Sequence, residues 1–152
     1  MDVSEPFTVE TVLVPVDGSE ESVTAVEYAT AVADRYDASV HVLFVLGRGV
    51  IAGMDAGTVA EDAVAEESQS FLEDVTTIAR QRDVPVASSV THGFSPSRKT
   101  LHPGSVILDT ADEVRADFVV IPRESMNDAP AEVLEKAAEY VLSYASQPVL
   151  SV

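Results

Sequence analysis

The sequence predicts an α/β fold: a doubly wound, five-stranded parallel sheet with helices on both faces, in a single domain over residues 1–152. Short apolar segments rich in β-branched residues alternate with longer segments whose apolar residues recur at helical spacing. Such alternation produces right-handed crossovers and therefore parallel strands. A length of 152 residues with 46% hydrophobic content suits one domain with a substantial core.

The first two predicted strands are Thr11–Val16 and Ser39–Leu46, whose nearly continuous apolar character is typical of strands buried on both faces. Between them, Asp17-Gly18-Ser19 is predicted to be a turn in which Asp17 or Ser19 caps the following helix. Acidic residues suit the first turn of that helix, since its dipole is positive there. The face expected against the sheet comprises Ala25, Tyr28, Ala29, Val32, Ala33 and Tyr36.

A glycine-spaced segment, Gly47–Gly57, is predicted to be a flexible loop at the carboxyl edge of the sheet. Ligands of such folds bind at that edge, so the loop could act as a lid. Its G-x-G-x-x-x-G spacing does not match the dinucleotide-binding fingerprint. A long helix follows to about Arg82. Its predicted apolar face comprises Val64, Phe71, Leu72, Val75, Ile78 and Ala79.

The second half of the chain supplies three more strands. Val84–Thr91 is more polar than the first two, which predicts a position near an edge of the sheet. An irregular loop, Gly93–Gly104, leads to a short helix that begins at Ser105. Asp117–Pro122 is the predicted fourth strand and Pro148–Val152 the fifth. The two helical faces in this half comprise Ile107, Ala111 and Val114, and then Leu134, Ala137, Ala138, Val141, Leu142 and Ala145.

Acidic residues dominate the charge of the chain. Aspartate and glutamate number 26 against nine lysines and arginines, which gives a formal net charge of −17. Only Lys99 and Lys136 are lysines. This charge causes self-repulsion at low salt, whereas 1 M salt shortens the Debye length to about 3 Å and removes most of that cost. The composition therefore favours a protein of an extreme halophile over a mildly acidic mesophilic protein.

The same charge argues against nucleic acid and membranes as partners, because both present negative charge that lysine and arginine would have to neutralise. The N-terminus MDVSEPFTVE has neither the basic start nor the apolar core of a secretory signal. No apolar run approaches the roughly 18–20 residues of a membrane span. We therefore expect a cytoplasmic protein. The absence of cysteine removes disulfides and thiolate chemistry.

Three segments resemble the universal stress protein family. TVLVPVDGSEESVTAVEYATAVADRYDASVHVLFV is similar to the family's first strand, turn, alanine-rich helix and second strand. VILDTADEVRADFVVIPRES resembles its third helix and fourth strand, and AAEYVLSYASQPVLSV its closing helix and strand. The resemblance implies a Rossmann-like sheet of the adenine nucleotide alpha hydrolase-like type. It also implies a homodimer that pairs through the last strand, at Val149, Leu150, Ser151 and Val152.

One branch of this family binds ATP through a loop after the fourth strand, with the pattern G-x-x-G, nine residues, then G-[S/T]. Pro122 and Ser125 stand at the first two glycine positions of this chain, and Glu135 and Lys136 stand at the final pair. Pro122 offers phosphate no N–H, and Glu135 would place a carboxylate where a triphosphate should sit. Lys136 compensates only as a point charge. We therefore expect a member of the family that lacks the ATP-binding glycine motif and carries no cofactor. The acidic composition makes it a member of haloarchaeal type.

The loop after the first strand keeps Pro15 and Asp17, which stand where ATP-binding members of the family contact adenosine. A weak adenosine or AMP site therefore stays open as an interpretation. The other interpretation of Asp17, which we favour, is a turn residue and helix cap.

The stretch Phe94–Pro103 concentrates positive charge in an otherwise acidic chain. Arg98, Lys99 and His102 lie within five positions of one another. They could bind an anion or an acidic partner near the carboxyl edge of the sheet. They could equally form a solvated loop whose cations offset neighbouring acids, and we favour this second interpretation.

A metal site is not expected. The three histidines are His41, His92 and His102. His41 lies near the start of the second predicted strand and His92 just past the end of the third, and therefore at opposite ends of a parallel sheet. His92 and His102 could meet, but two ligands make a weak site.

Two enzyme-like or signalling alternatives fail on their signature residues. A receiver domain needs an acidic pair after the first strand, an aspartate ending the third and a lysine ending the fifth, where this chain has Asp17 alone, Thr91 and Val152. A serine hydrolase needs a G-x-S-x-G elbow, which is absent. The sequence thus favours a non-enzymatic stress-response protein, a homodimer acting through an unknown protein partner. The alternative is an ATP or AMP switch, or a slow ATPase, with a degenerate pocket.

Overall fold

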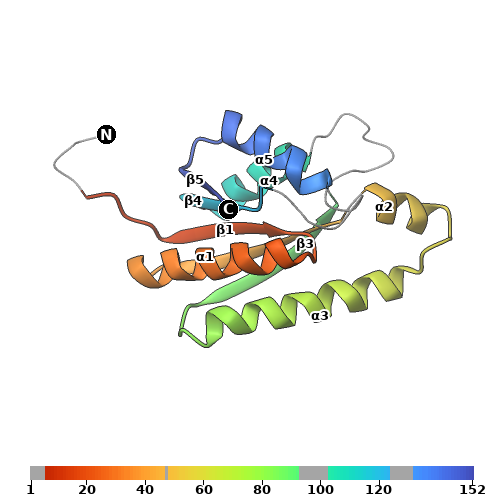
Figure 1. The fold of residues 1–152 in the computed structure, drawn as a ribbon, viewed down its shortest axis with the longest axis horizontal. Helices are drawn as coiled ribbons and strands as arrows, with labels where there is room; N and C mark the ends of the chain where they lie inside the picture. The colour runs from red at the N-terminus through yellow and green to blue at the C-terminus, as the bar shows by residue number, and fades with distance from the viewer. Residues whose placement is uncertain (1–5, 47, 93–102, 124–131) are drawn as a thin grey trace.

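The computed structural model describes residues 6–46, 48–92, 103–123 and 132–152. Five parallel strands form one sheet in the order β3-β2-β1-β4-β5. Figure 1 shows α1 and α3 on one face of this sheet and α4 and α5 on the other. The elements are β1 Thr11–Val16, α1 Glu20–Tyr36, β2 Ser39–Leu46, α2 Arg48–Asp55, α3 Glu61–Arg80, β3 Val86–His92, α4 Pro103–Glu113, β4 Phe118–Ile121, α5 Glu132–Tyr144 and β5 Val149–Ser151.

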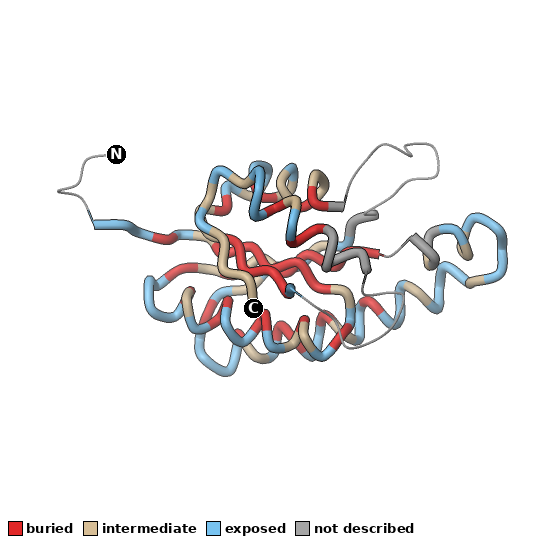
Figure 2. Tube along the Cα trace, turned by 45° about the horizontal axis from the view of Figure 1, so that its top comes forward, coloured by how far each residue is buried: buried red, intermediate tan, exposed pale blue. Residues whose placement is uncertain are grey.

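The predicted fold class is confirmed, and β1 lies at its centre. Figure 2 shows the central strands buried and the outer surfaces of the helices exposed. Because side chains alternate along a strand, Val12, Val14 and Val16 pack into the cluster beneath α1 and α3. Leu13 points the other way, into the cluster beneath α4 and α5. This burial on both faces explains why β1 reads as a nearly continuous apolar run.

The predicted helix faces are right at their centres and wrong at their margins. Ala25, Ala29 and Ala33 are fully buried, which lets α1 approach the sheet closely. Tyr28 and Tyr36 were expected on that face but are 50% and 42% exposed. Tyr36 instead meets the ring of Phe7 edge to face, with centroids 6.1 Å apart. A helix that packs through alanine leaves no room beneath it for tyrosine rings, so these stay at its flank.

The face predicted for α5 shows the same pattern. Ala137, Ala138 and Val141 are buried, and Ala145 packs beside them just after the helix. Leu142 is 53% exposed, and its placement on the buried face was therefore wrong.

The loop predicted over Gly47–Gly57 is also wrong, because most of it forms α2. Val50 and Met54, one turn apart, are half-buried and pack against the cluster beneath α1 and α3. Gly53 is needed for close packing, since a Cβ there would lie 2.5 Å from a methyl carbon of Val59. Gly57 follows the helix with φ +74°, a left-handed conformation that suits glycine. The glycines therefore mark a contact and a chain reversal, and the proposed lid has no support.

Several element boundaries differ from the predicted ones by one or two residues. β3 lies at an edge of the sheet, as its polarity predicted, but it includes His92. α4 begins at Pro103 rather than Ser105, so the end of the predicted loop Gly93–Gly104 is helical. The rest of that loop, residues 93–102, lies outside the described residues.

Candidate functional site

The carboxyl ends of β1 and β4 mark the point where the chain changes direction in the sheet. β1 pairs with β2 on one side and with β4 on the other. The connection after β1 leads to α1 on one face, whereas the connection after β4 leads to α5 on the opposite face (Figure 1). Open α/β sheets bind ligands at such a switch point, so the candidate site is built from the residues that follow these two strands.

Asp17 is held by a closed network of hydrogen bonds at the start of α1. Its Oδ1 accepts from the Ser19 amide at 3.0 Å, from the Ser19 hydroxyl and from the Ser22 hydroxyl at 2.7 Å. The Asp17 amide in turn donates to Ser22 Oγ at 2.9 Å. Ser19 is the N-cap, and its Oγ accepts from the Ser22 amide at 3.2 Å. Of the two predicted capping residues, Ser19 is the cap, and Asp17 holds the turn through the Ser19 amide and the hydroxyls of Ser19 and Ser22.

Gly18 allows this turn to form. Its φ is +89°, which side chains rarely tolerate. A Cβ at this position would lie 3.6 Å from the ring of Phe44, an ordinary contact, so conformation rather than space selects glycine.

The first turn of α1 is strongly negative. Glu20 and Glu21 follow the cap directly. The Oε2 atom of Glu21 is buried and has no hydrogen-bond partner among the residues that the structure describes. These carboxylates complement the positive end of the helix dipole, and they oppose the approach of an anion such as phosphate.

The backbone after β4 has few donors to offer. Pro122 is buried, directly follows Ile121 and has no N–H. The next amide, of Arg123, already donates to the Val152 carbonyl oxygen at 2.8 Å. The first two residues after β4 therefore present no free N–H to a ligand.

The other site residues predicted from the sequence are only partly placed. Pro15 is buried in β1, two residues before Asp17. Ser125 lies outside the described residues, as do Arg98, Lys99 and His102. Glu135 and Lys136 belong to α5, but their side chains are not among those described. The spacing of the degenerate glycine pattern and the proposed anion patch therefore remain predictions.

The two histidines that the structure describes, His41 and His92, do not converge. His41 pairs in register with Ala87, whereas His92 lies opposite Leu46, five positions further along the sheet, or about 16 Å. Among the described residues, no group of three potential ligands could hold a metal ion. The Nε2 atom of His41 instead lies 2.8 Å from Ser89 Oγ, and partial burial lowers the pKa of His41 below 6.5.

β5 forms the second edge of the sheet. Among the described strands it pairs with β4, through pairs such as Ile121 with Ser151. Residues 149–152 are half-buried.

None of the helices in the described part of the chain has the length and apolar character of a membrane span.

Comparison with known proteins identifies the family. Residues 8–152 match the model of the universal stress protein family. The chain belongs to this family. Universal stress protein MJ0531 of Methanocaldococcus jannaschii is 26% identical over 144 residues, which cover 93% of this chain and 80% of the relative.

Solved structures share the fold. The structure of protein MJ0577 superposes with a TM-score of 0.76 at 19% identity, covering 96% of each chain. The Archaeoglobus fulgidus universal stress protein in complex with dAMP has a TM-score of 0.65 at 20% identity, covering 95% of this chain and 98% of that one. These similarities establish the architecture of the chain.

Sequence reasoning missed Ser22 and Glu21 in the universal stress protein turn. Ser22 stands three positions after the N-cap, where a capping-box side chain would reach back toward the turn. That spacing was a usable signal. The burial of the Glu21 oxygen had none, because burial depends on tertiary packing.

We predict that replacing Asp17 by alanine destabilises the protein by about 1–3 kcal/mol, because three donors lose a charged acceptor. Denaturant unfolding at molar KCl measures the change. Asp17→Asn keeps one oxygen acceptor and should cost less than Asp17→Ala. Unchanged stability in Asp17→Ala would show that the carboxylate does not hold the turn.

We predict a pH dependence from His41. Its pKa is lowered in the folded state, so the unfolded chain takes up the proton first as pH falls below about 6.5. The stabilising contribution is present above that pH and is lost below it. Between pH 7.5 and pH 5, the wild-type protein should therefore lose more unfolding free energy than His41→Gln, measured by urea unfolding at equal KCl. Parallel pH profiles for the two proteins would contradict this origin.

Proposed function

We propose that residues 1–152 form a single universal stress protein domain that acts as a non-enzymatic stress-response homodimer, without ordinary ATP binding. The observation that carries the proposal is the chain after β4, where Pro122 has no N–H and the Arg123 amide is occupied by Val152. A phosphate loop depends on free backbone donors. The carboxylates of Glu20 and Glu21 across the switch point add repulsion.

We further propose that the protein works in a salt-rich cytoplasm of haloarchaeal type, through a protein partner and not through nucleic acid or membrane. The net charge of −17 supports this proposal, since only concentrated salt removes the self-repulsion. The arginines with described side chains are all exposed, and they are few: Arg35, Arg80, Arg82, Arg115 and Arg123.

A second candidate function is an adenosine-nucleotide switch or a slow ATPase. A similar fold binds dAMP in the Archaeoglobus fulgidus protein. In this chain, the hydrogen bonds that the Asp17 side chain makes with other described residues all use Oδ1. Its Oδ2 atom is therefore available to a ligand. Binding of AMP without ATP would favour this candidate.

We predict that the purified protein, denatured and analysed by mass spectrometry, releases no stoichiometric ATP. Calorimetry at molar KCl should show no tight binding of ATP. The variant Glu135→Gly with Lys136→Ser should not restore it, because Pro122 still lacks a donor.

The matched control adds Pro122→Gly to that pair of substitutions, and it should bind ATP more tightly than the pair alone. Submicromolar ATP affinity in the pair alone would refute this account of the loop. Stoichiometric ATP in the wild-type protein would refute the proposed function itself.

We predict that β5 forms the dimer. The amide of Val152 donates to Ile121 at 3.0 Å, so alternation along the strand points the Ser151 amide to the free edge. Exposed Leu142 and Tyr144 on α5, the helix that packs beside β5, add uncharged surface there. Light scattering at molar KCl should give twice the chain mass of 16.1 kDa.

Ser151→Pro should shift this dimer toward monomer, since it removes the outward N–H and leaves the β4–β5 bonds intact. Ser151→Ala is the control and should remain dimeric. A monomeric wild-type protein at high salt would remove the claim.

A further inference from the structure

The opposite edge of the sheet is longer and differs in chemistry from β5. β3 spans seven residues, against three in β5, and it pairs with β2 along its whole length. The sequence Val86–His92 contains no Asp, Glu, Lys, Arg or Pro. Charges and proline are the usual devices that protect an exposed edge from pairing. Within the described residues, no other strand pairs with β3.

The direction of the backbone groups follows from the register. The Val40 amide donates to the Pro85 carbonyl oxygen at 2.9 Å, and Val40 is paired with Val86. In a parallel ladder, this arrangement directs the peptide groups of Ala87 and Ser89 toward β2. The peptide groups of Val86, Ser88 and Val90 therefore point away from the sheet, as a row of donors and acceptors with which no other described strand pairs.

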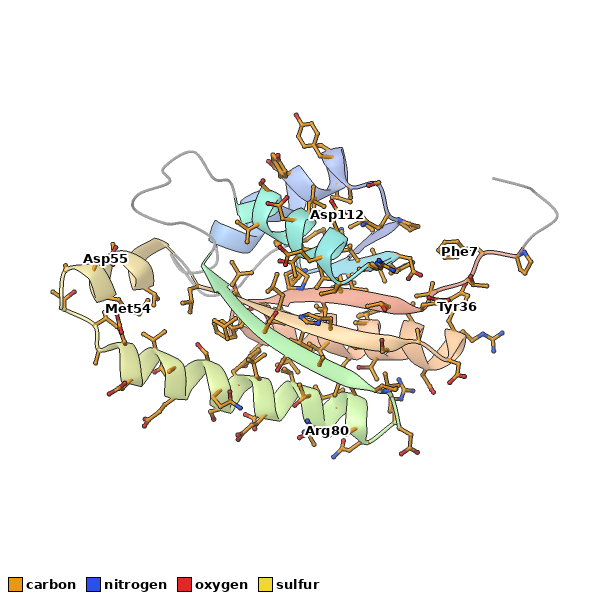
Figure 3. The ribbon with its side chains drawn as sticks, turned by 180° about the vertical axis from the view of Figure 1, so that it is seen from behind. Phe7, Tyr36, Met54, Asp55, Arg80 and Asp112 are labelled. Carbon is orange, nitrogen blue, oxygen red and sulfur yellow. The ribbon has the colours of Figure 1, made fainter. Side chains whose placement is uncertain are left out.

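The side chains along this edge do not shield it. Ala87 and Ser88 are exposed, and Val90 is 49% exposed, which is unusual for valine in a sheet. Figure 3 shows β3 as the strand nearest the viewer, with α3 running along it and Arg80 at the end of that helix. An added strand would thus lie beside α3 and against small or β-branched side chains.

α3 makes the surroundings of this edge strongly negative. Its only basic residue is Arg80, in the last turn. Its exposed acidic residues are Glu61, Asp62, Glu66, Glu67, Glu73 and Asp74. A second copy of this chain would bring an equal row of carboxylates against them. The charge therefore fits a different polypeptide, one with basic residues.

We propose that the free edge of β3 is a docking site for an extended segment of a partner protein, which adds a sixth strand to the sheet. The segment is uncharged where it pairs with Val86–His92 and carries lysine or arginine beside α3. Main-chain hydrogen bonds supply the affinity and the carboxylates of α3 select the partner. This site lies at the far side of the sheet from β5, so the proposed homodimer leaves it accessible.

Ser88→Pro is the decisive variant. It removes an outward N–H while the hydrogen bonds between β2 and β3 remain, because those use Ala87 and Ser89. Ser88→Ala is the matched control, since it removes the hydroxyl and keeps the N–H. The probe is a fluorescein-labelled seven-residue peptide of alternating threonine and valine with lysine at each end. Binding is measured by fluorescence anisotropy from 0.2 to 2 M KCl.

We expect saturable binding that weakens as KCl rises. Binding should fall at least about tenfold in Ser88→Pro, should change less than about twofold in Ser88→Ala, and should be unaffected by Ser151→Pro. The same peptide with glutamate at its ends should bind more weakly. Equal binding by Ser88→Pro and Ser88→Ala, or no saturable binding by the wild-type protein, overturns the proposal.

Amide hydrogen exchange of the wild-type protein provides a readout that does not depend on the folding of a variant. Without peptide, the amides of Ser88 and Val90 should exchange faster than those of Ala87 and Ser89. Saturating peptide should slow exchange at Ser88 and Val90. Protection that appears elsewhere and not at these two amides contradicts docking at β3.

Discussion

Burial of β1 on both faces is the constraint on which the rest of the molecule depends. Val14 and Leu13 anchor opposite layers of helices, and the strand has neighbours on both sides. β1 is buried up to its last residue, Val16, and α1 begins only four residues later, at Glu20. The chain must therefore leave the strand through a tight turn. The Asp17, Ser19 and Ser22 hydrogen bonds complete that turn within the first residues of α1. The hydrogen bonds that end β1 therefore also form one side of the candidate site.

The fold was readable from the sequence because each element is determined locally. β1 and β2 match their predicted bounds, since buried parallel strands are continuous apolar runs bounded by polar residues. α2 was not readable, because its helix is stabilised by Val50 and Met54 packing on a distant cluster. Glycine signals a loop, a close contact or a chain reversal, and only tertiary context decides which. The exposed Tyr28 and Leu142 have a similar cause, since helical spacing does not fix the width of the buried face.

The candidate site was readable only as a pattern of residue types. The sequence shows that Pro122 lacks a donor, but the use of the Arg123 amide by Val152 depends on the pairing of β4 with β5. For Asp17, the sequence predicts a turn residue and a helix cap, whereas the structure shows that three donors converge on its Oδ1 atom. The use of the Arg123 amide depends on a contact between segments far apart in the chain, which residue types alone do not specify. The donors to Asp17 are close in sequence, and the spacing of Ser22 from the N-cap was a usable signal for them.

The two edges of the sheet explain how one acidic domain could keep two kinds of contact separate. A sheet edge offers the same backbone groups wherever it lies, so selectivity must come from what flanks it. Beside β5, the described part of α5 exposes the uncharged side chains of Leu142 and Tyr144, with Glu139 as its one described carboxylate. Beside β3, α3 exposes a row of carboxylates, which a second copy would duplicate. Molar salt screens charges but leaves main-chain hydrogen bonds nearly unchanged. In a salt-rich cell the carboxylates would then discriminate among partners only at close range, where an extended strand lies directly beside the helix.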